Sequence, residues 1–245
     1  MKIAVISGAS SGMGLEFAKA LDLYGLDELW LIAKNDGLLE KNTTDFKTKL
    51  RLLPVDLTNQ DAFSYISEEY QKSNVEISYL ICSAGVGFNG DFRDISEKQI
   101  ALTISLNCTA LSLLIKVSQP YLTSGSRVIN IASGSGFTPQ PSFAVYAASK
   151  SYVISLSRAL GHEMRKQKVY FTAVCPGPVD TSFFSSLENV KEYKKKYLIS
   201  PQKVALGSLK AAKRKKKVYT PTFSMKAVHL ASKLLPTSLI LKFYK

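Results

Sequence analysis

Short, continuously apolar runs alternate with longer amphipathic stretches along this chain. The apolar runs predict strands at 2–7, 29–33, 50–55, 77–82, 127–132 and 169–175, with a short last strand at 217–219. Apolar residues at helical spacing predict helices at 14–24, 59–72, 97–123, 145–167 and 201–213. Because the strands have no polar face, we expect helices to cover both sides of the sheet.

This alternation is typical of an α/β protein with a Rossmann-type, doubly wound parallel sheet, here of about seven strands. We see no internal repeat and no linker, so we expect residues 1–245 to form a single domain. The segment at about 182–200 is polar and irregular, whereas the tail at about 222–245 is apolar and basic. Sheets of this kind bind ligands outside the carboxyl ends of their strands.

Composition narrows the class of protein. Hydrophobic residues make up 46% of the chain, which is enough for one large core. The first apolar run is too short for a signal peptide or a membrane span. Cys82, Cys108 and Cys175 are scattered, which predicts reduced, buried thiols and a cytoplasmic location. His162 and His229 stand alone, so we predict no metal site.

Positive charge is the unusual feature of the composition. The net charge of +13 is concentrated in two lysine-rich runs, at 191–196 and 210–217. Such runs attract phosphates, nucleic acid, anionic lipid or acidic substrates, and they also occur as ordinary solvated basic faces. Because aromatic residues do not alternate with arginine there, we expect no nucleic acid as a partner.

The stretch SGASSGMG, at 7–14, joins the first strand to the first helix. Gly8, Gly12 and Gly14 permit a tight turn, and the helix directs its free N–H groups and its positive end toward an anion. The spacing is G-x-x-x-G-x-G, not the common G-x-G-x-x-G fingerprint. The stretch therefore predicts a dinucleotide-phosphate site, with a glycine loop that serves only packing as the alternative.

The end of the second strand indicates which dinucleotide binds. A carboxylate at this place would bind the ribose hydroxyls of NAD and repel a 2′-phosphate. Here the strand ends with Lys34 and Asn35, and the first carboxylate is Asp36. Lys34 can pair with a phosphate, so we expect NADP(H) to be preferred, with NAD(H) possible as a cofactor. The alternative is an ordinary loop lysine.

Seven short motifs occur in one order along almost the whole chain: SGASSGMG at 7–14, VDLT at 55–58, CSAG at 82–85, SLN at 105–107, NIAS at 130–133, YAASK at 146–150 and PGPVDT at 176–181. In order and spacing they resemble the classical short-chain dehydrogenases/reductases. Ser133 precedes Tyr146 by 13 positions, as in that family. Each motif alone is weak, but seven in register are specific.

The resemblance implies roles for these residues. The catalytic residues would be Tyr146, Lys150, Ser133 and Asn107. The cofactor would be held by Gly8, Ser10, Ser11, Gly12, Met13, Gly14, Lys34, Asp56, Leu57, Ser83, Ala84, Gly85, Tyr146, Lys150, Pro176, Gly177, Val179 and Thr181. Among them, residues 10–13 would cradle the pyrophosphate, Asp56 and Leu57 the adenine, and Val179 and Thr181 the nicotinamide carboxamide.

Two departures from the family pattern stand out. Cys82 and Ser83 replace two asparagines at the end of the fourth strand, and Ser11 stands where some NADP-dependent members carry a basic residue. The resemblance further implies that Ser133 orients the substrate oxygen and that Asn107 binds a water for proton relay.

The pair Tyr146 and Lys150 has a simple electrostatic interpretation. Helical spacing of four places both side chains on one face of a helix. Lowering the pKa of a phenol by about 3 units requires about 4 kcal/mol, which a cation about 4 Å away supplies at an effective dielectric near 20. We therefore expect Lys150 to lower the pKa of Tyr146, and also to hold the nicotinamide ribose.

The predicted function is an NADP(H)-dependent oxidoreductase that interconverts a ketone or aldehyde and an alcohol. Phe183, Phe184 and Leu187 precede lysines at 191 and 194–196 in the region of the family's substrate lid. This favours a bulky apolar substrate with an acidic group, such as a hydroxysteroid, a bile acid or a 3-oxoacyl thioester. The alternative is a non-catalytic dinucleotide-binding sensor or regulator on the same fold.

The tail leaves three interpretations open: a subunit interface, a flap over the substrate cleft, or a membrane-surface anchor. Pro236 interrupts it, and it is too short to span a bilayer. Because members of the family usually form dimers or tetramers, we expect a homodimer or homotetramer.

Overall fold

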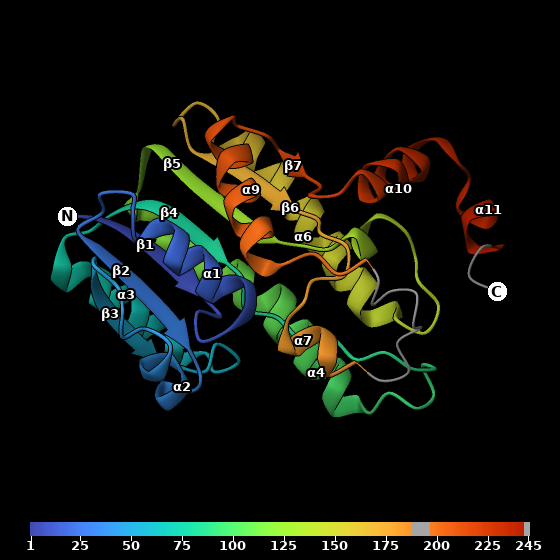
Figure 1. The fold of residues 1–245 in the computed structure, drawn as a ribbon, viewed down its shortest axis with the longest axis horizontal. Helices are drawn as coiled ribbons and strands as arrows, with labels where there is room; N and C mark the ends of the chain where they lie inside the picture. Colours follow the sequence, from blue (N-terminus) through green and yellow to red (C-terminus); the bar gives the residue numbers. More distant parts are fainter. Residues whose placement is uncertain (188–196, 243–245) are drawn as a thin grey trace.

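The computed structural model describes residues 1–187 and 197–242. Within them, seven parallel strands form one sheet in the order β3-β2-β1-β4-β5-β6-β7 (Figure 1). The strands are β1 Lys2–Ser7, β2 Glu28–Ala33, β3 Lys49–Pro54, β4 Glu76–Cys82, β5 Leu122–Ile131, β6 Tyr170–Val174 and β7 Val218–Tyr219. The predicted fold class is confirmed.

Helices cover both faces of the sheet. One face carries α1 Gly12–Leu21, α2 Asp36–Lys41 and α9 Pro201–Lys213, which share one apolar cluster with the strands. The other face carries α3 Asp61–Ser73, α5 Leu111–Ser118 and α6 Ala144–Glu163, which share the second cluster. The sheet therefore lies between two apolar layers, as its continuously apolar strands require.

The remaining helical elements join these strands and helices or follow the last strand. They are α4 Glu97–Ile104, the π-helical segment η1 Ser105–Ala110, the 3₁₀ turns η2 Gln119–Tyr121 and η3 Gly134–Phe137, α7 Ser182–Ser185, α10 Phe223–Leu234 and α11 Thr237–Leu241. In Figure 1, α10 and α11 project away from the sheet at the C-terminal end of the chain.

Three differences from the predicted elements have local causes. Helix α2 was not predicted, although Asn35 caps it by accepting a hydrogen bond from the Leu38 N–H at 2.9 Å. Strand β5 begins five residues before the predicted start, because Leu122 already pairs with Ile77 ahead of a register shift in β4. The long predicted helix at 97–123 is a rod of α4, η1, α5 and η2, with a π-helical turn in its middle.

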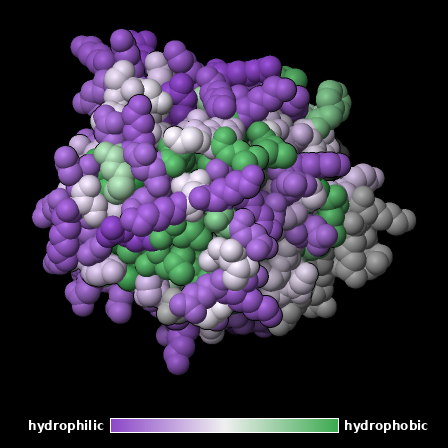
Figure 2. All heavy atoms as spheres, turned by 60° about the vertical axis from the view of Figure 1, so that its left-hand side comes forward, coloured by the Kyte–Doolittle hydropathy of each residue, from purple (hydrophilic) through white to green (hydrophobic). Residues whose placement is uncertain are grey.

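Figure 2 shows the face that comes forward from the left-hand side of Figure 1. It is mostly hydrophilic, and its hydrophobic patches are separated by polar side chains. This is the distribution expected for a surface that faces water.

Candidate active site

The predicted site residues gather where β1, β4, β5 and β6 end. The strand order reverses between β1 and β4, which is where sheets of this type form a ligand crevice. The Ser7 hydroxyl joins these two strand ends by accepting hydrogen bonds from the N–H groups of Ser83 at 3.0 Å and Ala84 at 3.2 Å. Sequence reasoning did not assign Ser7, because nothing in the motif distinguishes its hydroxyl from the others.

The glycine turn approaches the neighbouring strand end closely. A Cβ on Gly8, whose φ is +67°, would lie 2.9 Å from the Ala84 nitrogen, and one on Gly14 would overlap the Gly8 carbonyl. Within the described residues, Ser11 begins α1 without a side-chain cap, and the first turn of α1 contains no acidic residue. The turn thus offers backbone N–H groups at the positive end of a helix, and its residues fit a dinucleotide pyrophosphate.

At the expected adenosine end, Lys34 and Asp56 form an ion pair with 2.7 Å between Nζ and Oδ2. Lys34, together with the Thr58 hydroxyl and N–H, overcomes the opposing effect of burial and lowers the pKa of Asp56 to about 2. The Lys34 side chain is 79% exposed and can rotate toward a ligand. The Leu57 side chain packs in the core, which leaves its backbone to face a nucleotide.

The four predicted catalytic residues come from three elements. Tyr146 and Lys150 lie on α6, Asn107 lies on η1, and Ser133 follows β5. Lys150 Nζ donates a hydrogen bond to the Ile131 carbonyl at 2.9 Å and lies 5.6 Å from the centroid of the Tyr146 ring. Tyr146, Lys150 and Asn107 are buried, and the Ser133 hydroxyl interacts with that of Tyr146.

Gly85 leaves the space in which Asn107 and Lys150 meet. A Cβ there would lie 3.0 Å from Asn107 Oδ1 and 3.3 Å from Lys150 Nζ. The Asn107 side chain also holds neighbouring segments together. Its Oδ1 accepts from the Val86 N–H at 2.9 Å, and its Nδ2 donates to the Val86 carbonyl at 2.8 Å and to the Ser149 hydroxyl at 2.9 Å. Both amide hydrogens are therefore used in positioning the loop after β4 against α6.

One expectation about this site is wrong. Burial raises the pKa of Tyr146 to about 12, against an opposing hydrogen bond with the Ser133 hydroxyl. Burial also lowers the pKa of Lys150 to about 8, although the nearby Cys108 and Cys175 thiols act in the other direction. Lys150 does not bring the phenol toward neutrality, because removal of both groups from water penalises both charged forms.

Aromatic side chains surround the Tyr146 ring. Phe143 stacks on it at 4.3 Å between centroids, and Phe183 lies 5.6 Å away in a tilted arrangement. Gly87 faces the same ring so closely that a Cβ there would overlap it. Sequence reasoning missed Phe143 and Gly87, since they reach the site only through the fold.

At the expected nicotinamide end, a Cβ on Gly12 would lie 3.3 Å from Thr181 Cγ2, so the phosphate turn and the segment after β6 are in contact. The Pro176 carbonyl accepts a hydrogen bond from the Gly134 N–H at 2.8 Å. Met225 of α10 lies against Gly134 and Gly177. The tail thus reaches the site, although its sequence does not indicate which of its residues makes the contact.

The structure describes both ends of the predicted substrate lid, residues 182–187 and 197–200. Residues 182–185 form α7, whereas the lysines at 191 and 194–196 lie outside the described residues.

The fold and the arrangement of these residues define a dinucleotide-binding type of α/β protein. Residues 2–192 match the family described as short chain dehydrogenase. The chain therefore belongs to this family of oxidoreductases, as its motifs predicted.

Curated relatives carry the same general description. An uncharacterized oxidoreductase of Staphylococcus epidermidis is 29% identical over 182 residues, which cover 74% of this chain and 79% of that protein. An uncharacterized oxidoreductase of Staphylococcus aureus is 27% identical over 230 residues, which cover 93% and 97%.

Solved structures share the fold. A short-chain dehydrogenase from Sphingobium yanoikuyae in complex with NADPH has a TM-score of 0.81 and 24% identity, covering 98% of this chain and 95% of that one. A short-chain dehydrogenase/reductase from Burkholderia phymatum in complex with NAD has a TM-score of 0.83 and 21% identity, covering 95% and 94%.

The buried amine of Lys150 predicts a specific pH dependence of stability. Its pKa is about 8 in the folded protein, against 10.5 as the ordinary value. Between these pH values the unfolded chain holds a proton that the folded protein has released, so stability rises with pH. We expect this group to raise the free energy of unfolding by about 3 kcal/mol from pH 8 to 10.5.

The measurement is urea unfolding of the wild type and of Lys150→Met at pH 7.5, 9 and 10.5. In the variant, the free energy of unfolding should lack the increase with pH that Lys150 contributes. Equal pH slopes for the two proteins would contradict the burial of a charged amine.

Proposed function

We propose that this protein is an NADP(H)-dependent reductase that converts a ketone or aldehyde into the corresponding alcohol. The observation that carries the proposal is a buried phenol, paired with a serine hydroxyl and adjoining a buried amine, beside a glycine turn that fits a dinucleotide. When bound, the nicotinamide supplies a hydride, and the protein must supply a proton to the substrate oxygen.

Tyr146 is the proton donor in this proposal. With a pKa of about 12, it is protonated at neutral pH, which suits donation to a developing alkoxide. This favours the reductive direction. The Ser133 hydroxyl, which hydrogen-bonds with that of Tyr146, would hold the carbonyl oxygen of the substrate. Lys150, which donates to the Ile131 carbonyl, would bind the ribose hydroxyls and restore the proton of Tyr146.

Asn107 is proposed as a positioning residue. Its amide is engaged with Val86 and Ser149, so any water relay must use its backbone or the free lone pair of Oδ1.

The aromatic surroundings support a bulky apolar substrate. Phe143 and Phe183 lie beside the ring of Tyr146. Met225 contacts Gly134, the residue that follows Ser133. A hydroxysteroid, a bile acid or a 3-oxoacyl thioester fits this description. The sequence has lysines at 191 and 194–196, and this positive charge favours a substrate with an acidic group.

Lys34 supports NADP(H) over NAD(H). It is an exposed cation at the end of β2, and in the NADP(H) complex it would exchange its ion pair with Asp56 for one with the 2′-phosphate. The solved relatives are named as complexes with NADPH in one case and NAD in another, so the fold accommodates both dinucleotides.

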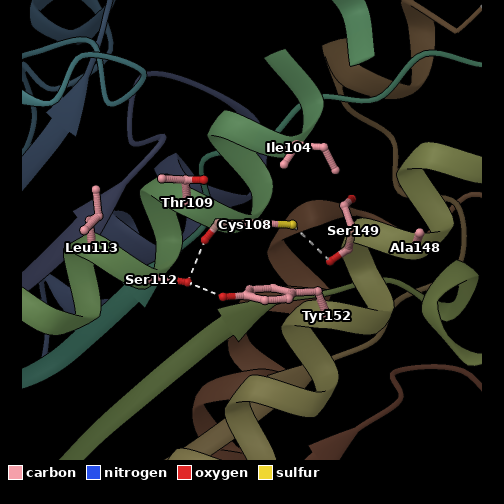
Figure 3. Close-up of a pocket in the computed structure, with 8 residues that line it drawn as sticks. All are labelled: Ile104, Cys108, Thr109, Ser112, Leu113, Ala148, Ser149 and Tyr152. Carbon is pink, nitrogen blue, oxygen red and sulfur yellow. Dashed lines mark hydrogen bonds between the residues drawn. The ribbon is translucent and has the colours of Figure 1, made fainter. Parts of the chain in front are cut away.

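We also propose that the protein is a homodimer or homotetramer through the rod at 97–121. This segment has the length and apolar composition of a membrane span, with mean hydropathy 1.8, yet it packs on α6 through Asn107 and Cys108. Only 39% of its apolar window is buried. The outer side of the rod and α6 forms an open pocket of about 510 Å³, where Tyr152 and Ser112 bond at 2.8 Å (Figure 3).

The apolar surface around this pocket suits a second copy of the chain, whose rod would pack in the hollow.

Three buried free thiols support a reducing, cytoplasmic location.

The first test replaces the proton donor. Tyr146→Phe should lower kcat for NADPH-dependent ketone reduction by about 10³-fold, since it removes the general acid, while the Kd for NADPH changes less than about twofold. Turnover is followed by NADPH absorbance over a panel of ketones, with Tyr65→Phe, an exposed tyrosine on α3, as the control. Full activity of Tyr146→Phe would mean that another group donates the proton. NADPH binding by a wild type that reduces no ketone would favour a non-catalytic sensor.

The second test concerns the cofactor. Lys34→Ala should lower kcat/KM for NADPH by about 10-fold and leave the value for NADH within about twofold, because only the 2′-phosphate loses a partner. Lys41→Ala, near the far end of α2, is the control. An equal effect on both cofactors would mean that Lys34 acts through Asp56 rather than through the phosphate.

The third test concerns assembly. Ile104 is an exposed apolar residue on the rod, and Ile104→Glu should convert the oligomer into a monomer at micromolar concentration, because a carboxylate would be buried unpaired. Sedimentation equilibrium measures the mass, with Leu23→Glu on the loop after α1 as the control. A wild type that sediments as a monomer would remove this part of the proposal.

A further inference from the structure

The charge of this protein is divided very unevenly along the chain. Residues 193–245 contain 14 lysines and arginines and no aspartate or glutamate. The other 192 residues contain the remaining 18 basic residues and all 19 acidic ones, and are nearly neutral. The whole excess of +13 therefore belongs to residues 193–245, and the tail at 222–245 contributes four of its lysines and no acidic residue.

The tail also exposes apolar side chains. Neither α10 nor α11 contains a buried residue. Phe223, Leu230 and Leu234 are 84%, 60% and 71% exposed, and helical spacing places them on one stripe of α10. Lys226 and Lys233 border this stripe, as on helices that lie in a membrane interface.

The opposite side of α10 is fixed to the body. Met225 lies against Gly134 and Gly177, and the His229 ring stacks on Phe137 at 4.3 Å with 15° between the planes. Because these contacts use the inner side of α10, the stripe of Phe223, Leu230 and Leu234 points outward. The stripe therefore does not cover the site as a flap. Leu235, Leu239 and Leu241 extend the exposed apolar surface into α11.

We propose that this tail surface docks on an anionic lipid bilayer. Exposed leucine and phenylalanine side chains would enter the acyl boundary, and the lysines would meet lipid phosphates. A second copy of the chain suits the surface less well, since a two-fold interface would bring the same lysines face to face. Nucleic acid would use the charge but leave the apolar stripe in water.

Docking would bring the edge of the site, on which the inner side of α10 packs, close to the bilayer. Met225 connects α10 to the turns that contain Ser133 and Pro176, and Leu241 lines an apolar hollow with Phe137, Pro139 and Ala147. A substrate dissolved in the lipid would then reach Tyr146 from the membrane side. This last step, unlike the docking, rests on the proposed reductase function.

The test is co-sedimentation of the full-length protein with vesicles of phosphatidylcholine alone or with 30% phosphatidylglycerol, at 0.1 M NaCl. We expect partitioning onto the anionic vesicles at least 10-fold stronger than onto the neutral ones. The triple variant Phe223→Ser, Leu230→Ser, Leu234→Ser should partition onto the anionic vesicles at least 10-fold more weakly than the wild type. The double variant Lys226→Gln with Lys233→Gln should lose both the binding and its dependence on salt. Leu23→Ser with Tyr65→Ser, exposed residues of the body, should bind as the wild type does.

Melting temperature and reduction of a water-soluble ketone should stay unchanged in the triple variant, since its three side chains are mostly exposed. Absence of wild-type binding to anionic vesicles would overturn the proposal, as would full binding by the triple variant. If the triple variant binds vesicles like the wild type but differs from it in oligomeric mass, the tail surface contacts a second copy of the chain. If the wild type and the triple variant bind duplex DNA equally and neither binds vesicles, the tail surface acts through its charge alone. Vesicle binding needs no turnover, so an inactive protein that still binds would leave the docking intact while the reductase proposal fails.

Discussion

The buried ammonium group of Lys150 and its hydrogen bond to the Ile131 carbonyl hold the candidate site together. This contact joins α6 to the end of β5, so it sets where Tyr146 and Ser133 stand relative to each other. Placing an amine out of water costs stability, and the fold accepts that cost where a polar partner is available. The geometry of the site and its shifted pKa values follow from the same burial.

Glycines then provide the space that the polar groups need. Gly85 leaves room between Asn107 and Lys150, and Gly87 allows the loop after β4 to lie on the Tyr146 ring. Asn107 closes this arrangement by bonding both the loop and Ser149 of α6. A π-helical turn places Asn107 in the middle of the rod, in keeping with the frequent occurrence of such turns at functional sites.

The body and the tail of the protein meet water in different ways. Residues 1–192 carry almost balanced charge, whereas residues 193–245 carry the entire excess of cations, and α10 and α11 within that part expose leucine and phenylalanine side chains. Met225 connects the two parts at the edge of the site. The proposed chemistry and the proposed docking surface are therefore adjacent, although they depend on separate sets of residues.

Most of the fold could be predicted from the sequence, because apolar runs and glycine turns are local signals. The strands, their parallel order, the phosphate turn and the pairing of Tyr146 with Lys150 on one helix all follow from spacing along the chain. The contacts of Lys34 with Asp56, of Asn107 with Val86 and of Phe143 with Tyr146 did not, because they depend on how the elements pack. The pKa of Tyr146 shows the difference most clearly. The spacing of the two residues indicates a helpful cation, but desolvation depends on everything packed around them, and only the tertiary structure decides it.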